Sequence, residues 1–247
     1  MIQLRNGATA NDERLGRIPH KDPRSAAYPV RTLLGAPAEE IPLRGYTWSV
    51  GQWFDQGREG ACVGFGFAHE LVARPRVIPG ITEATARAIY HSAQREDPWD
   101  GGSYPGAFPF YEGTAVDAGA SILKKAGYYT EYRWAHTERE MAITIGYKGP
   151  VVIGINWYTG MFSPNSDGFL EVTGQIEGGH CILVNGFSPK RGLYKLWNSW
   201  GPDWGMGGAA YVSRGDMARL IAENGDVCLP LRGRSQKTVM EIVEATA

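Results

Sequence analysis

Hydrophobic positions along this chain follow a helical period in the first half and a strand period in the second. Residues 62–73, CVGFGFAHELVA, predict a helix entered through Gly60. We expect it to end before Arg74-Pro75, because proline disfavours α geometry in the residue before it. Residues 83–95 predict a second helix with apolar positions at helical spacing.

Two further helices are predicted from capping signals, in which a side chain at the helix start binds a free backbone N–H. The first opens at Thr114 and ends at Gly127. The second opens at Thr137, whose capping box with Glu140 is complete, and it ends before Pro150.

After Pro150 the hydrophobic period shifts toward two, which is typical of strands separated by Gly and Pro turns. Asp216 is expected to begin a short helix within this half. Helices first and strands second predict an α+β chain with a helical lobe and a sheet lobe. The predicted strands are residues 151–158, 181–187, 193–199, 208–213 and 227–230.

The same patterns divide the chain into four parts. Residues 1–40 lack sustained periodicity and are rich in Arg, Pro and Ala, so we expect an extended arm. Residues 41–135 form the helical lobe and residues 136–230 the β-rich lobe. Residues 231–247 are interpreted as a tail with a frayed helix.

Composition and charge narrow the class of protein. The chain has 247 residues, enough for one large domain or two lobes, and a net charge of −1. This balance gives no electrostatic footprint for a nucleic-acid partner. The most apolar run, residues 151–155, is too short to span a membrane, and the N-terminus has no apolar signal region. We therefore expect a protein without nucleic-acid or membrane partners.

The cysteine count points to a reducing compartment. Cys62, Cys181 and Cys228 are widely spaced and odd in number, which is not the pattern of a disulfide framework. A single disulfide between Cys181 and Cys228 is the alternative. A cytoplasmic location is expected, with a virion-associated location as the alternative. The sequence does not indicate the oligomeric state.

A candidate nucleophile lies in residues 55–66, DQGREGACVGFG. Cys62 falls at the expected N-terminus of its helix, where the helix dipole and unpaired N–H groups favour a thiolate. A buried structural cysteine is the alternative. Gln56, across a glycine-rich turn, can donate its side-chain N–H to a developing oxyanion together with the backbone N–H of Cys62. For Gln56 the alternative is a solvent-facing turn residue.

A candidate base lies in residues 178–201. His180 begins the strand 181–187, and Asn198 ends the next strand, so antiparallel pairing could bring the two side chains together. Trp200 would then cover the contact from water. His69 is the rival base, but it lies two helical turns after Cys62 on the same helix, too far for a hydrogen bond. We interpret His69 as a packing or surface residue.

These segments resemble the papain-like cysteine peptidases. The resemblance rests on DQGREGACVGFGFA, GGHCILVNGF and KLWNSWGPDWGMGGAAYVS and spans roughly residues 41–230. It is nearest to the bacterial and viral branch without disulfides, in which an Ile-Pro stretch followed by an Arg (here Ile41 to Arg44) precedes the DQG segment. It implies a two-lobed fold, with a helical lobe, an antiparallel β-barrel-like lobe and an active site in the interlobe cleft.

The resemblance also implies roles for single residues. Cys62 would be the nucleophile and His180 the base and acid. Asn198 would orient the imidazole, Gln56 would donate to the oxyanion, and Trp200 would shield the leaving-group side. His180 lies nearer to Cys62 along the chain than the usual window of about 130–150 residues, which predicts shorter loops in the β-rich lobe.

Substrate-side residues follow from the same likeness. Gly154 would line the pocket for the side chain that precedes the scissile residue. The peptide backbone would be held as an added strand by the segment around Gly102 or by the one around Gly113. A buried strand glycine and plain turns are the alternatives. Glu59, where secreted relatives place a cysteine, and the short arm both depart from the secreted members.

The predicted function is therefore hydrolysis of peptide bonds in peptide or protein substrates through a thioester acyl-enzyme. One alternative keeps the same residues but acts on another amide, such as a cell-wall crosslink or an isopeptide. Another is a non-catalytic binding or structural protein with this fold. Motifs for zinc, paired cysteines and nucleotide phosphates are absent, so no metal or organic cofactor is expected.

Overall fold

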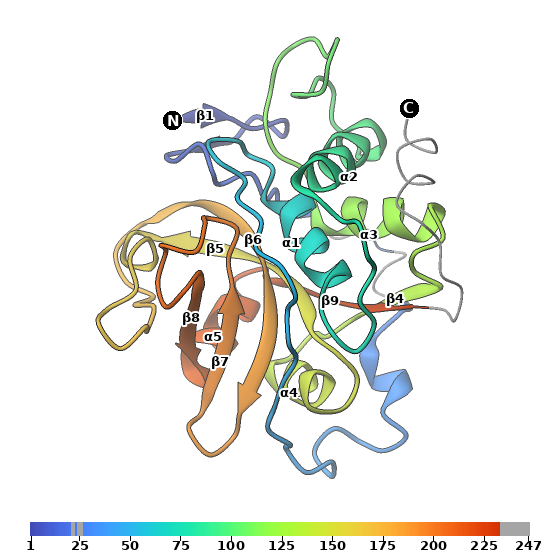
Figure 1. Ribbon diagram of the computed structural model, residues 1–247, viewed down its shortest axis with the longest axis vertical. Coiled ribbons are helices and arrows are strands. Elements are labelled where there is room, and N and C mark those ends of the chain that lie inside the picture. Colours follow the sequence, from blue (N-terminus) through green and yellow to red (C-terminus); the bar gives the residue numbers. More distant parts are fainter. Residues whose placement is uncertain (21–22, 24–26, 233–247) are drawn as a thin grey trace.

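The computed structural model describes residues 1–20, 23 and 27–232. From residue 233 onward, the predicted tail lies outside the described residues. Helices α1, α2 and α3 gather on one side of the molecule, and an antiparallel sheet lies on the other (Figure 1). Helix α4 packs on the sheet strands β5 and β6. The chain is thus α+β, as predicted.

The helical side begins with α1, Cys62–Leu71, which follows Gly60 as predicted and is buried along its whole length. Helix α2, Glu83–Glu96, starts with a capping box between Thr82 and Thr85. Helix α3, Val116–Lys125, has Ala115 at its N-cap and no side-chain cap. The predicted cap at Thr114 is therefore wrong, because its hydroxyl donates to Asp97 instead.

Two helices belong to the sheet side. Helix α4, Glu138–Tyr147, begins as predicted, with the Thr137 hydroxyl accepting a hydrogen bond from the Glu140 N–H. Helix α5, Arg214–Ala222, starts two residues before the predicted Asp216. The reason is that Ser213 is the N-cap, and its hydroxyl accepts from the Asp216 N–H in the first turn.

The sheet places its strands in the order β4-β9-β5-β6-β7-β8, and β3 pairs with β6. Every pairing is antiparallel. Among the described residues no pairing joins the end strands β4 and β8, so the predicted barrel-like lobe is an open sheet whose edge strand β4 lies against α3. The strands are β3 Tyr46–Thr47, β4 Glu131–Trp134, β5 Val151–Tyr158, β6 Ile176–Ser188, β7 Leu193–Trp197, β8 Ala209–Ser213 and β9 Asp226–Leu231.

Strand β6 is longer than predicted, so His180 lies inside it and not at its start. The sequence predicts a strand that begins after Gly178-Gly179, and these two glycines are expected to let another backbone approach closely. A Cβ on Gly178 would lie 3.0 Å from the Leu15 Cβ, and one on Gly179 would overlap the Arg17 carbonyl oxygen. The strand therefore continues, and the glycines let the N-terminal segment approach its backbone closely.

The N-terminal segment packs against the body of the molecule. It starts with a small hairpin of β1, Ile2–Gln3, and β2, Thr9–Ala10, and later forms a 3-10 turn, η2, Val30–Leu33. Its apolar side chains Leu15 and Ile18 are fully buried in the same core cluster as the sheet residues. The arm therefore contributes to the core of the sheet side.

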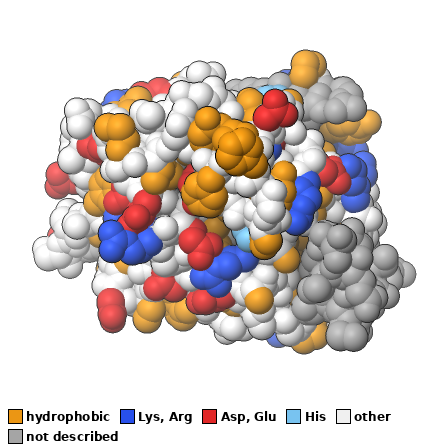
Figure 2. Space-filling view, turned by 90° about the horizontal axis from the view of Figure 1, so that it is seen from above, with side chains coloured by type: hydrophobic (Ala, Val, Ile, Leu, Met, Phe, Trp, Pro, Cys, Tyr) orange, Lys and Arg blue, Asp and Glu red, His pale blue; other side chains and the backbone are white. Residues whose placement is uncertain are grey.

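Figure 2 views the molecule from the end at which the hairpin lies, and it shows hydrophobic side chains gathered among mixed acidic and basic ones. The loop between α2 and α3 carries the exposed Phe108 and Phe110, which are 93% and 65% accessible. No helix within the described ranges is both long and apolar enough to cross a membrane. The same residues contain no group of three His, Cys, Asp or Glu side chains that could hold a metal ion.

Candidate active site

Cys62 is the first residue of α1, as predicted. Its backbone N–H lies in the first turn, where no intrahelical acceptor is available. The side chain is fully buried. Its sulfur lies beside the backbone of Gly16 in the arm and of Cys181 in β6, and both hydrogen-bonding contacts favour the thiolate. The fold thus brings the thiol next to the strand residue that follows His180.

His180 and Asn198 meet as the strand pairing predicted. Strands β6 and β7 are antiparallel, and Asn198 directly follows β7. The His180 Nε2 lies 2.7 Å from the Asn198 Oδ1. The Ser199 backbone N–H donates to the same oxygen at 2.8 Å, which identifies that atom as an acceptor. His180 therefore carries its proton on Nε2 and donates it to Asn198.

This tautomer leaves Nδ1 of His180 as a bare acceptor. That nitrogen is buried and has no hydrogen-bond partner among the described residues. No hydrogen bond joins it to the Cys62 thiol in this arrangement. The backbone of the next residue, Cys181, contacts the Cys62 thiol. A buried imidazole nitrogen without a partner, one residue away, is the feature expected of a proton acceptor.

Aromatic rings enclose the imidazole. The ring centroids of His180 and Trp200 are 4.8 Å apart, and those of His180 and Trp157 are 4.7 Å apart. The Phe162 ring stacks on Trp200, with 5.7 Å between the ring centroids. The predicted position of Trp200 over the His180–Asn198 contact agrees with this packing. Trp157 and Phe162 were not predicted as part of the site, because their place depends on the pairing of β5 with β6.

Gln56 is buried and directed inward, not toward solvent. Its Oε1 accepts from the Ser199 hydroxyl at 2.6 Å, which leaves the Nε2 group as the donor. That nitrogen donates to the Glu59 carbonyl at 2.7 Å and to the Arg14 carbonyl at 3.0 Å. An amide donor near the nucleophile is therefore already bound to a carbonyl of the N-terminal arm.

The arm occupies the place of the predicted interlobe cleft. The Arg17 N–H donates to the Gly179 carbonyl on the sheet side at 3.0 Å. On the helical side, the Thr114 N–H donates to the Gly16 carbonyl, and the Ile18 N–H donates to the Thr114 carbonyl. Residues 16–18 thus form backbone hydrogen bonds with both sides at once.

Gly16 passes so close to the nucleophile segment that a Cβ would overlap the Gly60 carbonyl oxygen. The Arg14 guanidinium, two residues earlier, lies over the Trp200 ring at 4.1 Å. Beside it a cavity of about 440 Å³ opens, with Arg14, Asp55 and Trp200 in its lining. A cavity of about 940 Å³ elsewhere, lined in part by Asp117 and Lys124, includes neither Cys62 nor His180 and is not the reactive site.

Burial beneath the arm decides the charge state of the two reactive groups. It raises the pKa of the Cys62 thiol to about 11, and the nearby backbone of Gly16 and Cys181 opposes this rise only in part. Burial also lowers the pKa of His180 to about 4, while the hydrogen bond to Asn198 acts in the opposite direction. With the arm in place both groups are neutral near pH 7, so the thiolate expected from the sequence is suppressed.

The predicted substrate-side residues divide into two groups. A Cβ on Gly154 would lie 2.8 Å from the Arg17 Nε, so this glycine lines a space that the Arg17 side chain fills. Gly113 lies beside the arm, since its Cβ would be 2.8 Å from the Gly16 carbonyl oxygen. Gly102 instead pairs with its own loop, through hydrogen bonds to Pro109 and Tyr111. Of the two predicted segments, the one around Gly113 holds the arm.

Three further residues at the site, besides Trp157 and Phe162, were not predicted. Ser199 orients Gln56, Arg17 fills the space over Gly154, and Asp226 binds the Arg17 side chain. The NSW triplet around Ser199 is a local signal that could have found the first. His69, the rival base, is buried and accepts from the Phe54 N–H at 3.1 Å, in agreement with its interpretation as a packing residue.

A family model described as papain family cysteine protease matches residues 100–227, just over half of the chain. The matched range contains His180 and Asn198, and it begins after Cys62. A cysteine protease of Blomia tropicalis is 30% identical over 91 residues, which are 35% of this chain and 27% of that protein. The match therefore spans about a quarter of that relative's length.

Solved structures are similar over most of the chain. Xylellain, a cysteine protease from Xylella fastidiosa, has a TM-score of 0.67 at 17% identity, covering 92% of this chain and 99% of its own. Digestive procathepsin L2 from Tenebrio molitor has a TM-score of 0.59 at 16% identity, covering 89% and 79%. These similarities show the two-lobed papain-like fold. Placement in the bacterial and viral branch stays a prediction.

Proposed function

The chain belongs to the papain family of cysteine proteases, and from this premise we propose that it hydrolyses peptide bonds with Cys62 as its nucleophile. The observation that carries the proposal is the hydrogen bonding of the His180 ring. Its Nε2 hydrogen is held by Asn198, and its Nδ1 is left without a partner. A neutral imidazole with this tautomer can accept a proton from a thiol.

The proposed reaction begins when His180 takes the Cys62 proton and the sulfur attacks the peptide carbonyl carbon. The carbonyl oxygen becomes negative and accepts hydrogen bonds from the Gln56 Nε2 group and the Cys62 N–H. The C–N bond then breaks, and imidazolium returns its proton to the leaving amine. A water molecule, deprotonated by His180, hydrolyses the thioester and regenerates the thiol.

The position of Gln56 supports its role as oxyanion donor. Its Nε2 already binds a carbonyl oxygen of the arm, that of Arg14. Its orientation is held by the Ser199 hydroxyl on the opposite atom of the amide. We interpret the Arg14 carbonyl as occupying the region that a substrate carbonyl would enter.

The direction of the arm explains why a peptide in this position would resist cleavage. In a substrate, the residue in the Gly154 pocket precedes the scissile carbonyl. In the arm the order is reversed, because Arg17 lies over Gly154 and the earlier residue Arg14 faces Gln56. The arm therefore runs opposite to the proposed substrate and blocks the site without presenting a bond to Cys62.

The test uses the full chain carrying Gly16→Ala, in which the added Cβ cannot fit against the Gly60 carbonyl and the arm is expected to leave. We expect this variant to hydrolyse casein faster than the wild type and to react with an electrophilic peptide. Adding Cys62→Ala should abolish hydrolysis and labelling, because the attacking atom is gone. Adding Cys228→Ala, at a thiol buried in β9, is the matched control and should leave both intact.

Hydrolysis that survives Cys62→Ala would show that the nucleophile is wrong. No hydrolysis by the wild type or by Gly16→Ala would favour the non-catalytic alternative. Hydrolysis of peptidoglycan fragments with none of casein would favour the alternative amide substrate.

A further inference from the structure

The side chain of Arg17 is fully buried in a pocket at the junction of the arm, α3 and the sheet. Its Nε lies 3.1 Å from the Asp226 Oδ2, and its Nη2 lies 2.5 Å from the same oxygen. The same Nη2 also donates to the Asn224 carbonyl at 2.5 Å. A guanidinium thus reaches the inner end of the pocket and finds a carboxylate and a carbonyl as acceptors.

The pocket has room for a long side chain because its walls include glycines. A Cβ on Gly154 would lie 2.8 Å from the Arg17 Nε and 3.0 Å from its Cγ. The same Cβ would lie 2.7 Å from a methyl group of Val116, the first residue of α3. A Cβ on Gly179 would lie 3.1 Å from the Arg17 Cδ. Any larger residue at either glycine would fill the space that the arginine now occupies.

The residue that carries the carboxylate at the inner end belongs to the sheet and not to the arm. Asp226 begins β9 and lies opposite Gly154 in the pairing of β5 with β9. Its side chain is 3% accessible with the arm present. If the arm leaves, the pocket keeps the Asp226 carboxylate at its inner end and loses the Arg17 guanidinium.

The backbone around Arg17 is held between the two sides of the molecule. Its N–H donates to the Gly179 carbonyl, and its neighbours pair with Thr114 on the opposite wall. A substrate strand between the same walls would direct one side chain over Gly154 and toward Asp226.

We propose that Asp226 makes this enzyme selective for substrates with an arginine or lysine in the Gly154 pocket, and that Arg17 occupies that place in the resting chain. The inference rests on the proposed peptidase function. Arginine should be favoured over lysine, because its planar fork can bind the carboxylate and the Asn224 carbonyl together. An acidic side chain should be rejected, since it would meet a like charge in a buried space.

The first test measures binding without catalysis. In the full chain with Arg17→Ala, the pocket is empty of its cation, and propylguanidinium should restore thermal stability while the neutral propylurea does not. Wild-type protein, whose pocket is filled, should not respond to either compound. Arg17→Ala with Asp226→Asn should lose the response to propylguanidinium. Equal stabilisation by the two compounds, or a response that survives Asp226→Asn, would overturn the proposal.

The second test measures cleavage in the full chain with Gly16→Ala, which leaves the pocket residues unchanged. Peptides that differ only at the pocket position, with arginine, lysine, norleucine or glutamate, are compared by kcat/KM. We expect arginine to exceed norleucine by roughly 10-fold or more, and Asp226→Asn to remove that difference. Cleavage with no preference for the basic peptides would overturn the selectivity while leaving the peptidase function intact.

The two tests separate the two hypotheses. If no peptide is cleaved, the peptidase function fails, and the propylguanidinium response still decides whether the pocket selects cations. If Arg17→Ala does not fold, the cleavage comparison decides, because it does not use that variant. If both obstacles occur, calorimetric titration of Gly16→Ala with propylguanidinium and propylurea decides, and indistinguishable affinities would refute the proposal.

Discussion

At the residue scale, the proposed chemistry depends on where the proton of His180 lies. The Asn198 oxygen accepts from the Ser199 N–H and therefore presents an acceptor to His180 Nε2. Asn198 neither touches a reacting atom nor changes charge, so it acts as a positioning residue. Its effect is on the orientation and tautomer of the imidazole.

We predict that Asn198→Ala lowers kcat/KM by roughly 10- to 100-fold without abolishing activity, because the imidazole remains but is no longer held. The measurement is the pH profile of kcat/KM in the Gly16→Ala chain. Asn198→Asp keeps the acceptor oxygen and adds a negative charge, so it should retain more activity and raise the pKa of His180. Equal activity in the alanine and aspartate variants would contradict the positioning role.

At the scale of single elements, α1 carries the proposed nucleophile at its first residue and is buried along its whole length. Cys62 opens the helix, and all its other residues are buried as well. His69 lies two turns further on, stacks on Phe54 and accepts from its N–H. Burial lowers the pKa of His69 to about 3. The helix is therefore anchored by a neutral histidine that must be desolvated on folding.

This histidine predicts an acid dependence of stability. The fold lowers the pKa of His69 from 6.5 to about 3, so above pH 6.5 the residue is neutral in both the folded and the unfolded chain. As the pH falls from 6.5 toward about 3, only the unfolded chain binds the proton, and stability is lost. The slope is up to about 1.4 kcal/mol per pH unit. In His69→Gln, whose amide oxygen can accept the same bond, the free energy of unfolding should fall less steeply between pH 6 and 4.

Denaturant unfolding at several pH values measures the effect. His136→Gln, at an exposed histidine, is the matched control and should follow the wild type. An acid slope in His69→Gln as steep as that of the wild type would show that this group does not carry the dependence.

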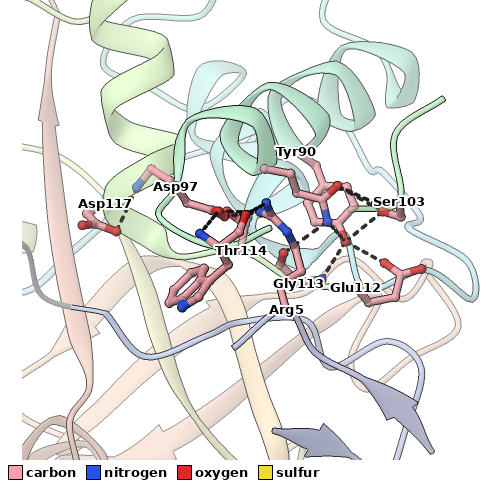
Figure 3. A network of polar contacts seen from close by, with 11 residues as sticks. Arg5, Tyr90, Asp97, Ser103, Glu112, Gly113, Thr114 and Asp117 are labelled. Carbon is pink, nitrogen blue, oxygen red and sulfur yellow. Dashed lines mark hydrogen bonds and ion pairs between the residues drawn. The ribbon is translucent and has the colours of Figure 1, made fainter. Parts of the chain in front are cut away.

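At the scale of the whole molecule, the arm lies between the two sides and covers the proposed site. A polar network links it to the helical side (Figure 3). The buried Arg5 guanidinium bonds both carboxylate oxygens of Asp97 at 2.5 Å and also donates to the Trp99 carbonyl. Asp97 accepts from the Thr114 hydroxyl in turn, and Thr114 pairs with the arm at Gly16.

We predict that Arg5→Ala raises the rate of casein hydrolysis by the full chain by roughly 10-fold or more. The reason is that a buried carboxylate would lose its cation, which destabilises the closed arrangement. Arg31→Ala, at an exposed arginine in the 3-10 turn of the same arm, should leave the rate unchanged. Hydrolysis by Arg5→Ala at the wild-type rate would show that this network does not keep the site closed.

The sequence by itself determined the helix that opens at Cys62, the strand pairing that joins His180 to Asn198 and the fold class. These follow from local signals, since hydrophobic period, glycine and proline positions and motif spacing act over short stretches of chain. Its local rules failed at the start of β6, because this strand continues through Gly178-Gly179, where the arm lies against its backbone.

Only the tertiary structure decided what occupies the site and in which charge state. Arg17 and Asp226 are 209 positions apart, and no local pattern relates them. Their contact, the burial of Cys62 and the reversed direction of the arm all arise from packing between segments remote in the chain. Desolvation by that packing, which no single stretch of sequence encodes, holds the thiol and the imidazole neutral.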